Sequence, residues 1–348
     1  MHGAFFPAPN VNTKIMKIAV DAMGGDDAPA AVVEGAIIAA REYDVAPVLV
    51  GDEVEIKKAL SVHNVMGLPL SVVHASQRVE MYESPSSVIR KKKDSSIWVA
   101  TRLVKEGEAV AVVSAGNTGA SMATGLLHLK PLSCVERPAI ATPLPTLSGT
   151  AIMIDVGANV DCKPNHLFQF AIMGSIYAEE IFGIISPRVG LLSIGEEETK
   201  GNELTKEVFK MLKQSKLNFV GNVEGRDVYS GGVDVIVCDG FTGNVALKIS
   251  EGLSEAMRQF LKQEILASTA GKLGYALLKS SFARFKKKID YAQYGGAPLL
   301  GLDGVSIISH GHSSPEAIKN AIRVAKESYR RGVARHIKEQ TEDHMKRA

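Results

Sequence analysis

Residues 109–120 read AVAVVSAGNTGA. An apolar run that is typical of a buried β-strand ends here in a loop of small and polar residues, and a helix is expected to begin near Gly119. Glycine in such a loop leaves backbone N–H groups open to a ligand, and many α/β enzymes bind phosphate or another anion in this way. The stretch therefore predicts one strand–loop–helix unit of an α/β enzyme.

The same unit recurs along the chain. Five more loops of this kind follow apolar runs: DAMGGD (21–26), DVGANVD (155–161), GEEETKGNE (195–203), DGFTGNV (239–245) and SHG (309–311). Strands are expected at 17–23, 46–51, 70–75, 138–142, 150–155, 188–195, 219–223, 233–240 and 305–310. Helices are expected near 29–43, 53–61, 95–106, 164–182, 203–214 and 243–265. This alternation predicts a mostly parallel sheet with crossover helices.

The end of the chain has its own pattern. Apolar residues, mostly four apart from Ile318 to Ile337, predict one continuous last helix that begins after Ser313 or Ser314.

The composition describes a protein with a large core. Its 348 residues are 45% hydrophobic and 22% charged, which suffices for one large core or two lobes. We expect a single two-lobed α/β catalytic domain over residues 16–340. Residues 1–15 are interpreted as a tag or upstream extension, and residues 341–348 as a polar tail. The net charge of +2 provides no field that favours nucleic acid as a partner.

The cysteines and the apolar runs bear on location. Cys134, Cys162 and Cys238 show no spacing typical of a disulfide framework or a zinc site, so they fit reduced thiols. The first residues lack the pattern of a signal peptide. No run approaches the roughly 20 apolar residues that span a bilayer. We therefore expect a cytoplasmic protein that does not cross a membrane.

Taken in order, the loops have a family resemblance. DAMGGD, SAGNTGA, DVGANVD, GEEETKGNE, DGFTGNV, YGGAPLLG (294–301) and HG together resemble the bacterial phosphate acyltransferase (PlsX) family, from about Lys17 to about Arg335. The resemblance implies a doubly wound, mostly parallel α/β sheet with a cleft, similar to phosphotransacetylases and to isocitrate and isopropylmalate dehydrogenases. It also implies a homodimer.

The resemblance implies an activity as well. Members of that family move a long-chain fatty acyl group from acyl carrier protein to inorganic phosphate, and a membrane glycerol-phosphate acyltransferase uses the acyl phosphate in phospholipid synthesis. Two alternatives stay open: a phosphotransacetylase-like enzyme that uses a short acyl-CoA, and a non-catalytic membrane scaffold for phospholipid synthesis.

Residues 233–248 (VDVIVCDGFTGNVALK) separate this chain from its metal-dependent relatives. The dehydrogenases place carboxylates on the following helix to hold a divalent metal, whereas this chain has Asn244 and Lys248. A cation on that face suits phosphate or acyl phosphate, so we expect no metal. The alternative is that Asn244 merely caps the helix and Lys248 is a solvated surface residue.

The expected reaction needs no cofactor and no covalent acyl-enzyme. Phosphate is already nucleophilic, so positioning and hydrogen bonding to the oxyanion supply most of the rate. The sequence contains no GxSxG elbow. Cys238 is interpreted as a small buried residue rather than as a nucleophile.

The loops supply the candidate site residues. Lys200 is the leading candidate to neutralise charge on phosphate or the oxyanion, and Asn244 and His310 complete the expected catalytic set; for both Lys200 and His310 a purely surface or structural role is the alternative. Residues expected to bind phosphate or substrate are Asn117, Thr118, Gly119, Asp155, Asn159, Asp239, Gly243 and Lys248. Thr118 as an ordinary helix cap is the alternative for the first group, and the carboxylates are expected to pair with cations or to stabilise loops, since they repel phosphate.

Residues 264–288 combine apolar and basic side chains without an acidic residue after Glu264. That composition is typical of an amphipathic element that contacts anionic lipid, which predicts peripheral membrane association. The residues expected to contact membrane or carrier protein are Leu273, Leu277, Leu278, Phe282, Arg284, Lys286 and Lys287. The alternative is a helical hairpin packed in a dimer interface. RKKK (90–93) is either a second docking site for the acidic carrier protein or a solvated charge run.

Overall fold

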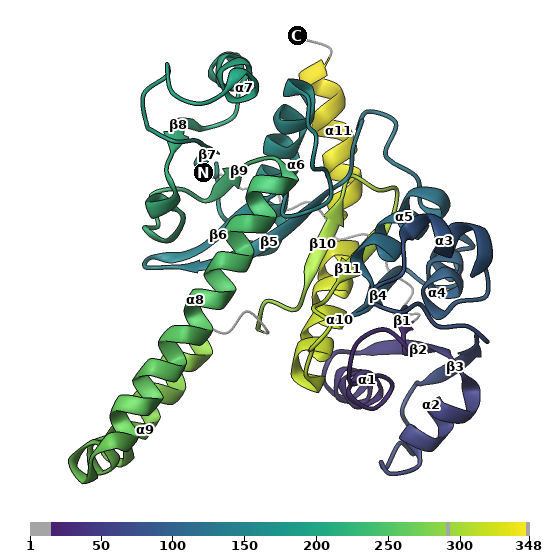
Figure 1. The fold of residues 1–348 in the computed structure, drawn as a ribbon. Coiled ribbons are helices and arrows are strands. Elements are labelled where there is room, and N and C mark those ends of the chain that lie inside the picture. Colours follow the sequence, from purple (N-terminus) through teal and green to yellow (C-terminus); the bar gives the residue numbers. More distant parts are fainter. Residues whose placement is uncertain (1–14, 290–292, 346–348) are drawn as a thin grey trace, which may run out of the picture.

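A single mixed β-sheet forms the centre of the molecule. The computed structural model describes residues 15–289 and 293–345, with side chains described for 15–285 and 293–343. Within these residues the sheet has eleven strands in the order β3-β2-β1-β4-β11-β10-β5-β6-β9-β7-β8 (Figure 1). Strands far apart in the sequence are therefore neighbours, as crossover connections require.

The first parallel run lies at one end of the sheet. Its strands are β1 (Met16–Asp21), β2 (Val45–Gly51), β3 (Ser71–His74), β4 (Ala111–Ser114) and β11 (Val305–Ile308). The helices between them are α1 (Ala30–Glu42), α2 (Glu53–Leu60), α3 (Pro85–Lys91), α4 (Ser96–Lys105) and α5 (Thr118–His128). Fully buried aliphatic side chains such as Ile18, Ile37 and Leu49 fill the space between this run and its helices, so apolar burial holds the layers together.

The second parallel run lies at the other end. It comprises β6 (Gly149–Ile154), β7 (Val189–Leu192), β8 (Phe219–Val223) and β9 (Val235–Val237). Its helices are α6 (Pro164–Phe182) and α7 (Glu203–Gln214), with a short 3₁₀ turn, η1 (Gly225–Tyr229). The side chains of Leu167, Phe170 and Tyr177 on α6 are buried in a second core against this run.

Two antiparallel strands join the runs and reverse the sheet. β10 (Ala297–Leu300) pairs antiparallel with both β11 and β5 (Ala139–Thr146), and β5 pairs antiparallel with β6. The two parallel runs consequently point in opposite directions. β10 was not among the expected strands, because a four-residue element that contains Pro298 carries too short a pattern to recognise.

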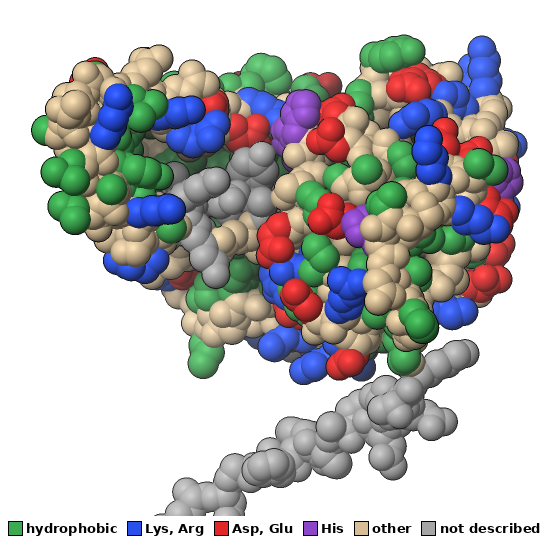
Figure 2. All heavy atoms as spheres, turned by 90° about the horizontal axis from the view of Figure 1, so that it is seen from below, with side chains coloured by type: hydrophobic (Ala, Val, Ile, Leu, Met, Phe, Trp, Pro, Cys, Tyr) green, Lys and Arg blue, Asp and Glu red, His purple; other side chains and the backbone are tan. Residues whose placement is uncertain are grey.

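A long helical hairpin extends beyond the sheet. α8 (Gly240–Ala267) and α9 (Thr269–Ile289) pack side by side and project away from the core in Figure 1. Seen from below, hydrophobic and basic side chains gather on this projection (Figure 2). Only the first turns of α8 reach the core, where Ala246 and Leu247 pack against a cluster that contains Ile140 and Ile308.

The prediction of one continuous last helix is wrong. The chain forms α10 (Pro315–Arg330) and α11 (Val333–Met345), separated at Gly332, whose φ of +65° lies in the left-handed region. Glycine adopts that conformation without strain and so ends helices. The expected start is confirmed, since the Ser314 hydroxyl accepts a hydrogen bond from the backbone N–H of Ala317.

The expected fold class, a doubly wound and mostly parallel α/β sheet, is confirmed. Residues 1–14 of the expected extension and 346–348 of the expected tail lie outside the described residues. We keep the two-lobed catalytic domain over 16–340 as a proposal. Within the described residues, no helix combines the length and apolar character that crossing a bilayer requires.

Candidate functional site

The SAGNTGA loop begins α5, and Asn117 rather than Thr118 is its cap. The Asn117 Oδ1 accepts a hydrogen bond from the backbone N–H of Ala120 at 2.9 Å. Its Nδ2 donates to three carbonyl oxygens, those of Glu80, Met81 and Glu83. The alternative of a Thr118 cap is therefore wrong. The Asn117 side chain holds a neighbouring loop, while Thr118 is exposed at the positive end of the helix.

A buried carboxylate fixes the first two glycine-rich loops against each other. Asp21 ends β1 and is 3% exposed, and its Oδ2 accepts a hydrogen bond from the Ser114 hydroxyl at 2.7 Å. That hydroxyl in turn accepts from the backbone N–H of Gly116. Burial raises the pKa of Asp21. A Cβ on Gly24 would lie 2.5 Å from the Asp21 carboxylate, so glycine is required where the loops meet.

The SHG loop joins this group. The backbone N–H of Asp26 donates to the Gly311 carbonyl oxygen at 2.9 Å, and the Asp26 carboxylate lies 2.8 Å from His312 Nδ1. The loops that follow β1, β4 and β11 thus form one cluster at the carboxyl ends of the first run.

The second cluster is built around Asp155. Its carboxylate is fully buried and accepts hydrogen bonds from the backbone N–H groups of Ile140, Gly157, Ala158 and Asn159 and from the Asn159 side chain. Burial raises its pKa, which these bonds oppose. Among the described residues it pairs with no cation. Of the two roles expected for this carboxylate, its contacts therefore support loop stabilisation rather than pairing with a cation.

The start of α8 packs directly on this loop. A Cβ on Gly243 would lie 1.9 Å from the Asp155 carbonyl oxygen, so no larger residue fits. Asp239 caps α8 by accepting from the backbone N–H and the hydroxyl of Thr242, which is a loop-stabilising role. The alternative of Asn244 as the cap is therefore wrong. Asn244 is exposed in the second turn, and a Cβ on Gly157 would lie 3.6 Å from its side chain.

The two clusters meet at Lys248 and His310. The Lys248 Nζ lies 3.4 Å from His310 Nε2 and 2.8 Å from the carboxylate of Glu251. Partial burial lowers the pKa of His310 below its ordinary 6.5, and the Lys248 charge lowers it further, while Glu251 acts in the opposite direction. The imidazole is therefore mainly neutral near pH 7. The two clusters belong to parallel runs that point in opposite directions. The contact between Lys248 on α8 and His310 therefore joins them.

The described contacts of Lys200 lie within its own loop. It is exposed in the loop after β7, where its backbone N–H and the Asn222 side chain both donate to the Glu197 carbonyl oxygen. Within the described residues, no hydrogen bond or ion pair joins Lys200 to Asn244, Lys248 or His310. Its catalytic role stays a prediction.

The surroundings of Cys238 and of the possible metal ligands bear on two further expectations. Cys238 is 2% exposed, and burial raises its pKa well above that of an ordinary thiol, which disfavours the thiolate that a nucleophile needs. In the described part of the chain, no group of three or more His, Cys, Asp or Glu side chains is arranged to hold a metal ion.

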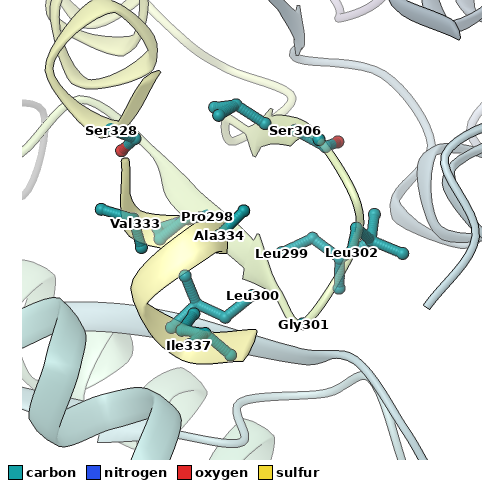
Figure 3. A pocket seen from close by; sticks show the side chains of 12 residues that line it. Pro298, Leu299, Leu300, Gly301, Leu302, Ser306, Ser328, Val333, Ala334 and Ile337 are labelled. Carbon is teal, nitrogen blue, oxygen red and sulfur yellow. The ribbon is translucent and has the colours of Figure 1, made fainter. Parts of the chain in front are cut away.

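A small apolar cavity lies away from these loops. It lies between β10, β11 and α11, with Leu300, Leu302, Val333 and Ile337 among its lining (Figure 3). Its volume of about 20 Å³ leaves room for at most one water molecule. None of the candidate site residues lines this cavity.

The residues predicted to contact membrane lie on α9. Leu273, Leu277 and Leu278 are exposed, as is Arg284, while Phe282 is half-buried with its ring centroid 5.2 Å from that of Tyr275. The side chains of Lys286 and Lys287 lie outside the described residues. In RKKK, Lys92 is not a solvated charge, because it pairs with Glu83 and donates to the Arg78 carbonyl oxygen at 2.6 Å.

Sequence reasoning missed Asp21, Ser114 and Asn222 as loop-holding residues. A carboxylate at the end of an apolar strand was the available signal for Asp21. Nothing in the sequence pairs it with Ser114, 93 residues away.

Two phosphotransacetylases are among the solved structures that share this fold. The EutD phosphotransacetylase from Staphylococcus aureus has a TM-score of 0.60 and 17% identity, over 90% of this chain and 94% of that one. A phosphotransacetylase from Streptococcus pyogenes has a TM-score of 0.61 with the same identity and coverage. At such identity the likeness shows the fold class alone: an α/β fold shared with phosphotransacetylases.

Sequence similarity narrows this class to one family. Residues 16–336 match the family described as "Fatty acid synthesis protein". Proteins named phosphate acyltransferase from Pelobacter propionicus, Geobacter sulfurreducens and Geotalea uraniireducens are 54%, 55% and 56% identical, over 94–95% of this chain and 94–96% of theirs. The chain belongs to this phosphate acyltransferase (PlsX) family and is an acyltransferase.

Proposed function

We propose that this protein transfers a long-chain fatty acyl group from acyl carrier protein to inorganic phosphate. The observation that carries the proposal is the 54–56% identity to phosphate acyltransferases over nearly the full length of both chains. The product is an acyl phosphate, which a membrane glycerol-phosphate acyltransferase consumes in phospholipid synthesis.

The proposed reaction is a direct displacement. A phosphate oxygen attacks the thioester carbonyl carbon, a C–O bond forms, and the C–S bond breaks as the tetrahedral intermediate collapses. The electron pair leaves on the pantetheine sulfur, and no acyl-enzyme forms. The burial of Cys238 supports this route, because a thiol with a raised pKa is a poor nucleophile.

We assign phosphate to the meeting point of the two loop clusters. The ammonium of Lys248 and the neighbouring imidazole of His310 are suited to hold a dianion, and Asn244 adds a neutral donor on the same helix. The N-terminal N–H groups of Thr118 and Gly119 contribute a positive helix end. Lys200, on an exposed loop, is proposed to complete the charge neutralisation when substrate is bound.

The same proposal includes a homodimer that contacts anionic membrane. Exposed apolar side chains follow α8 four residues apart, at Phe241, Val245, Ile249, Leu253 and Met257. We define these as the α8 stripe and propose that a second copy of the chain covers it, since exposure of so long a stripe is unfavourable. The α9 residues Leu273 and Leu277, with basic neighbours, are proposed to contact lipid.

The test is thiol release from palmitoyl-acyl carrier protein with and without inorganic phosphate, with hydroxylamine to trap the acyl phosphate. Palmitoyl-CoA and acetyl-CoA are assayed in parallel. We expect phosphate-dependent release and a trapped hydroxamate from the carrier-protein donor. Activity with acetyl-CoA alone would instead indicate a phosphotransacetylase-like enzyme, and no activity with any donor would favour a scaffold.

A further inference from the structure

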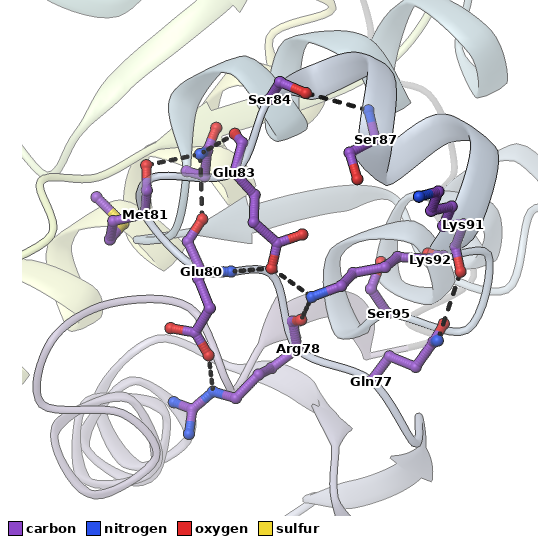
Figure 4. A network of polar contacts seen from close by, with 11 residues as sticks. Gln77, Arg78, Glu80, Met81, Glu83, Ser84, Ser87, Lys91, Lys92 and Ser95 are labelled. Atoms are coloured by element: carbon purple, nitrogen blue, oxygen red, sulfur yellow. Dashed lines mark hydrogen bonds and ion pairs between the residues drawn. The ribbon is translucent and has the colours of Figure 1, made fainter.

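A polar network holds residues 78–84, which we call the strap, beside the site. The Lys92 ammonium pairs with the Glu83 carboxylate and donates to the Arg78 carbonyl oxygen, and the Glu80 backbone N–H donates to Glu83 at 3.2 Å (Figure 4). The Asn117 amide donates to the carbonyl oxygens of Glu80, Met81 and Glu83 at 3.2, 2.8 and 3.0 Å. The strap is therefore fixed to the cap of α5.

The strap presents two large apolar side chains outward. Met81 is 47% exposed and Tyr82 is 87% exposed, and in Figure 4 the Met81 side chain points away from the polar network. A single exposed apolar side chain is ordinary on a protein surface. These two differ because the strap backbone beneath them is held by several hydrogen bonds, so their position is determined rather than incidental.

The location of Met81 links the strap to the reacting groups. A Cβ built on Gly311 would lie 3.2 Å from the Met81 Cε, and Gly311 directly follows His310. The Gly311 carbonyl oxygen also accepts a hydrogen bond from the backbone N–H of Asp26. On the other side, a Cβ on Gly119 would lie 2.6 Å from Pro85 Cγ. Met81 in the strap thus lies beside the SHG loop, and Pro85, directly after the strap, lies beside the start of α5.

We propose that Met81 and Tyr82 contact the fatty acyl chain of the thioester donor and set the preference for its length, an inference that rests on the proposed function. An acyl chain offers only methylene groups, which an unbranched Met side chain and the face of a Tyr ring bind by dispersion and burial. The pantetheine arm of the donor carries two amides, and the Met81 side chain can form no hydrogen bond with them that would favour pantetheine over the acyl chain. Asn117 acts as a positioning residue through the strap.

The experiment compares the chain-length dependence of kcat/KM for wild type, Met81→Ala and Tyr82→Ala, with butyryl, octanoyl and palmitoyl carrier-protein donors. Each contact buries several methylene groups, so we expect about a tenfold fall for the palmitoyl donor and little change for the butyryl donor. Tyr82→Phe is expected to behave as wild type. Met66→Ala and Ile185→Ala remove exposed apolar side chains elsewhere and serve as matched controls.

The substitution Asn117→Ser distinguishes the two roles of Asn117, holding the strap and capping α5. Serine caps a helix about as well as asparagine but cannot reach the three carbonyl oxygens. We expect it to lose selectivity for the long donor as the strap variants do, with a smaller change in melting temperature than Asn117→Ala.

The outcomes are distinct. An equal fall for all three donors would place Met81 and Tyr82 against pantetheine or carrier protein, and no fall would remove them from the site; either result overturns the inference while wild-type activity keeps the proposed function. If the wild type uses acyl-CoA instead, the same series is run with acyl-CoA donors. Wild-type inactivity with every thioester overturns both.

Discussion

Individual residues in this protein have roles that depend on which neighbour they meet. Asn117 and Asn244 each directly follow a glycine, yet the Asn117 side chain caps a helix and also donates to three carbonyl oxygens. Asn244 is exposed one turn into α8. The second therefore has its side chain open to substrate, and the first acts through the strap.

The proposed contacts of Lys200 and Asn244 with phosphate or the oxyanion are tested by alanine substitution. We expect Lys200→Ala and Asn244→Ala each to lower kcat about 100-fold, as loss of an oxyanion or phosphate contact does, with the melting temperature nearly unchanged because both side chains are exposed. Lys206→Ala, an exposed lysine on α7, is the matched control. Activity and melting temperature falling together would contradict the assignment.

Partial burial lowers the pKa of His310, and among the neighbouring charges Lys248 and Glu251 have the largest effects. Lys248→Met removes the cation and should raise the His310 pKa toward its ordinary value, whereas Glu251→Gln removes the opposing anion and should lower it. NMR titration of the imidazole measures both shifts. The neutral imidazole is present above the lowered pKa, so activity that depends on His310 should fall only as the pH drops through that pKa. In Lys248→Met, where the pKa is higher, this fall should begin at a higher pH. Lys213→Met, whose ion pair is with Glu198, should leave the titration unchanged.

At the scale of elements, α8 links the site to the exterior. Its first turn is packed against the Asp155 loop, its second and third turns carry Asn244 and Lys248, and its remaining turns leave the core. Backbone contact at Gly243 therefore sets where these two candidate side chains lie.

Two glycines of α8 give opposite expectations. In Gly243→Ala the new Cβ would lie 1.9 Å from the Asp155 carbonyl oxygen and 2.8 Å from Cys238 Sγ, so the helix must shift, at a cost of about 2 kcal/mol in the free energy of unfolding. In Gly252→Ala the Cβ meets no atom within 4 Å, and helix propensity should add about 0.5–1 kcal/mol. Urea unfolding distinguishes the two. A Gly243→Ala protein as stable as wild type would show that the loop contact is not rigid.

At the scale of the whole molecule, the hairpin has two exposed apolar surfaces with different expected partners. The α8 stripe runs along the helix, and the apolar residues of α9 have basic neighbours and no acidic residue between 268 and 289. We expect the first to be covered by a second copy of the chain and the second by lipid.

Paired substitutions separate these surfaces. Ile249→Lys with Leu253→Lys should convert the dimer to a monomer in light scattering, because two buried ammonium groups without partners oppose association. Leu273→Asp with Leu277→Asp should leave the dimer intact and reduce flotation with anionic vesicles at least several-fold. A dimer that survives the α8 pair, or vesicle binding that survives the α9 pair, would contradict the corresponding surface.

The local pattern of this sequence determined the elements: α6, α7 and β8 lie where their apolar periods predicted them, and the six glycine-rich loops follow strands as expected. These features depend on neighbours within a few residues, so the sequence carries them directly. The reversal of the sheet combines two local hairpins, β10 with β11 and β5 with β6, with the pairing of β10 and β5. That last pairing joins segments more than 100 residues apart, and no local pattern records it. The same holds for the site. Asp21 with Ser114, Asn117 with the strap, and Lys248 with His310 are contacts between distant segments, and the packing of α8 across the two runs decided which candidate side chains meet.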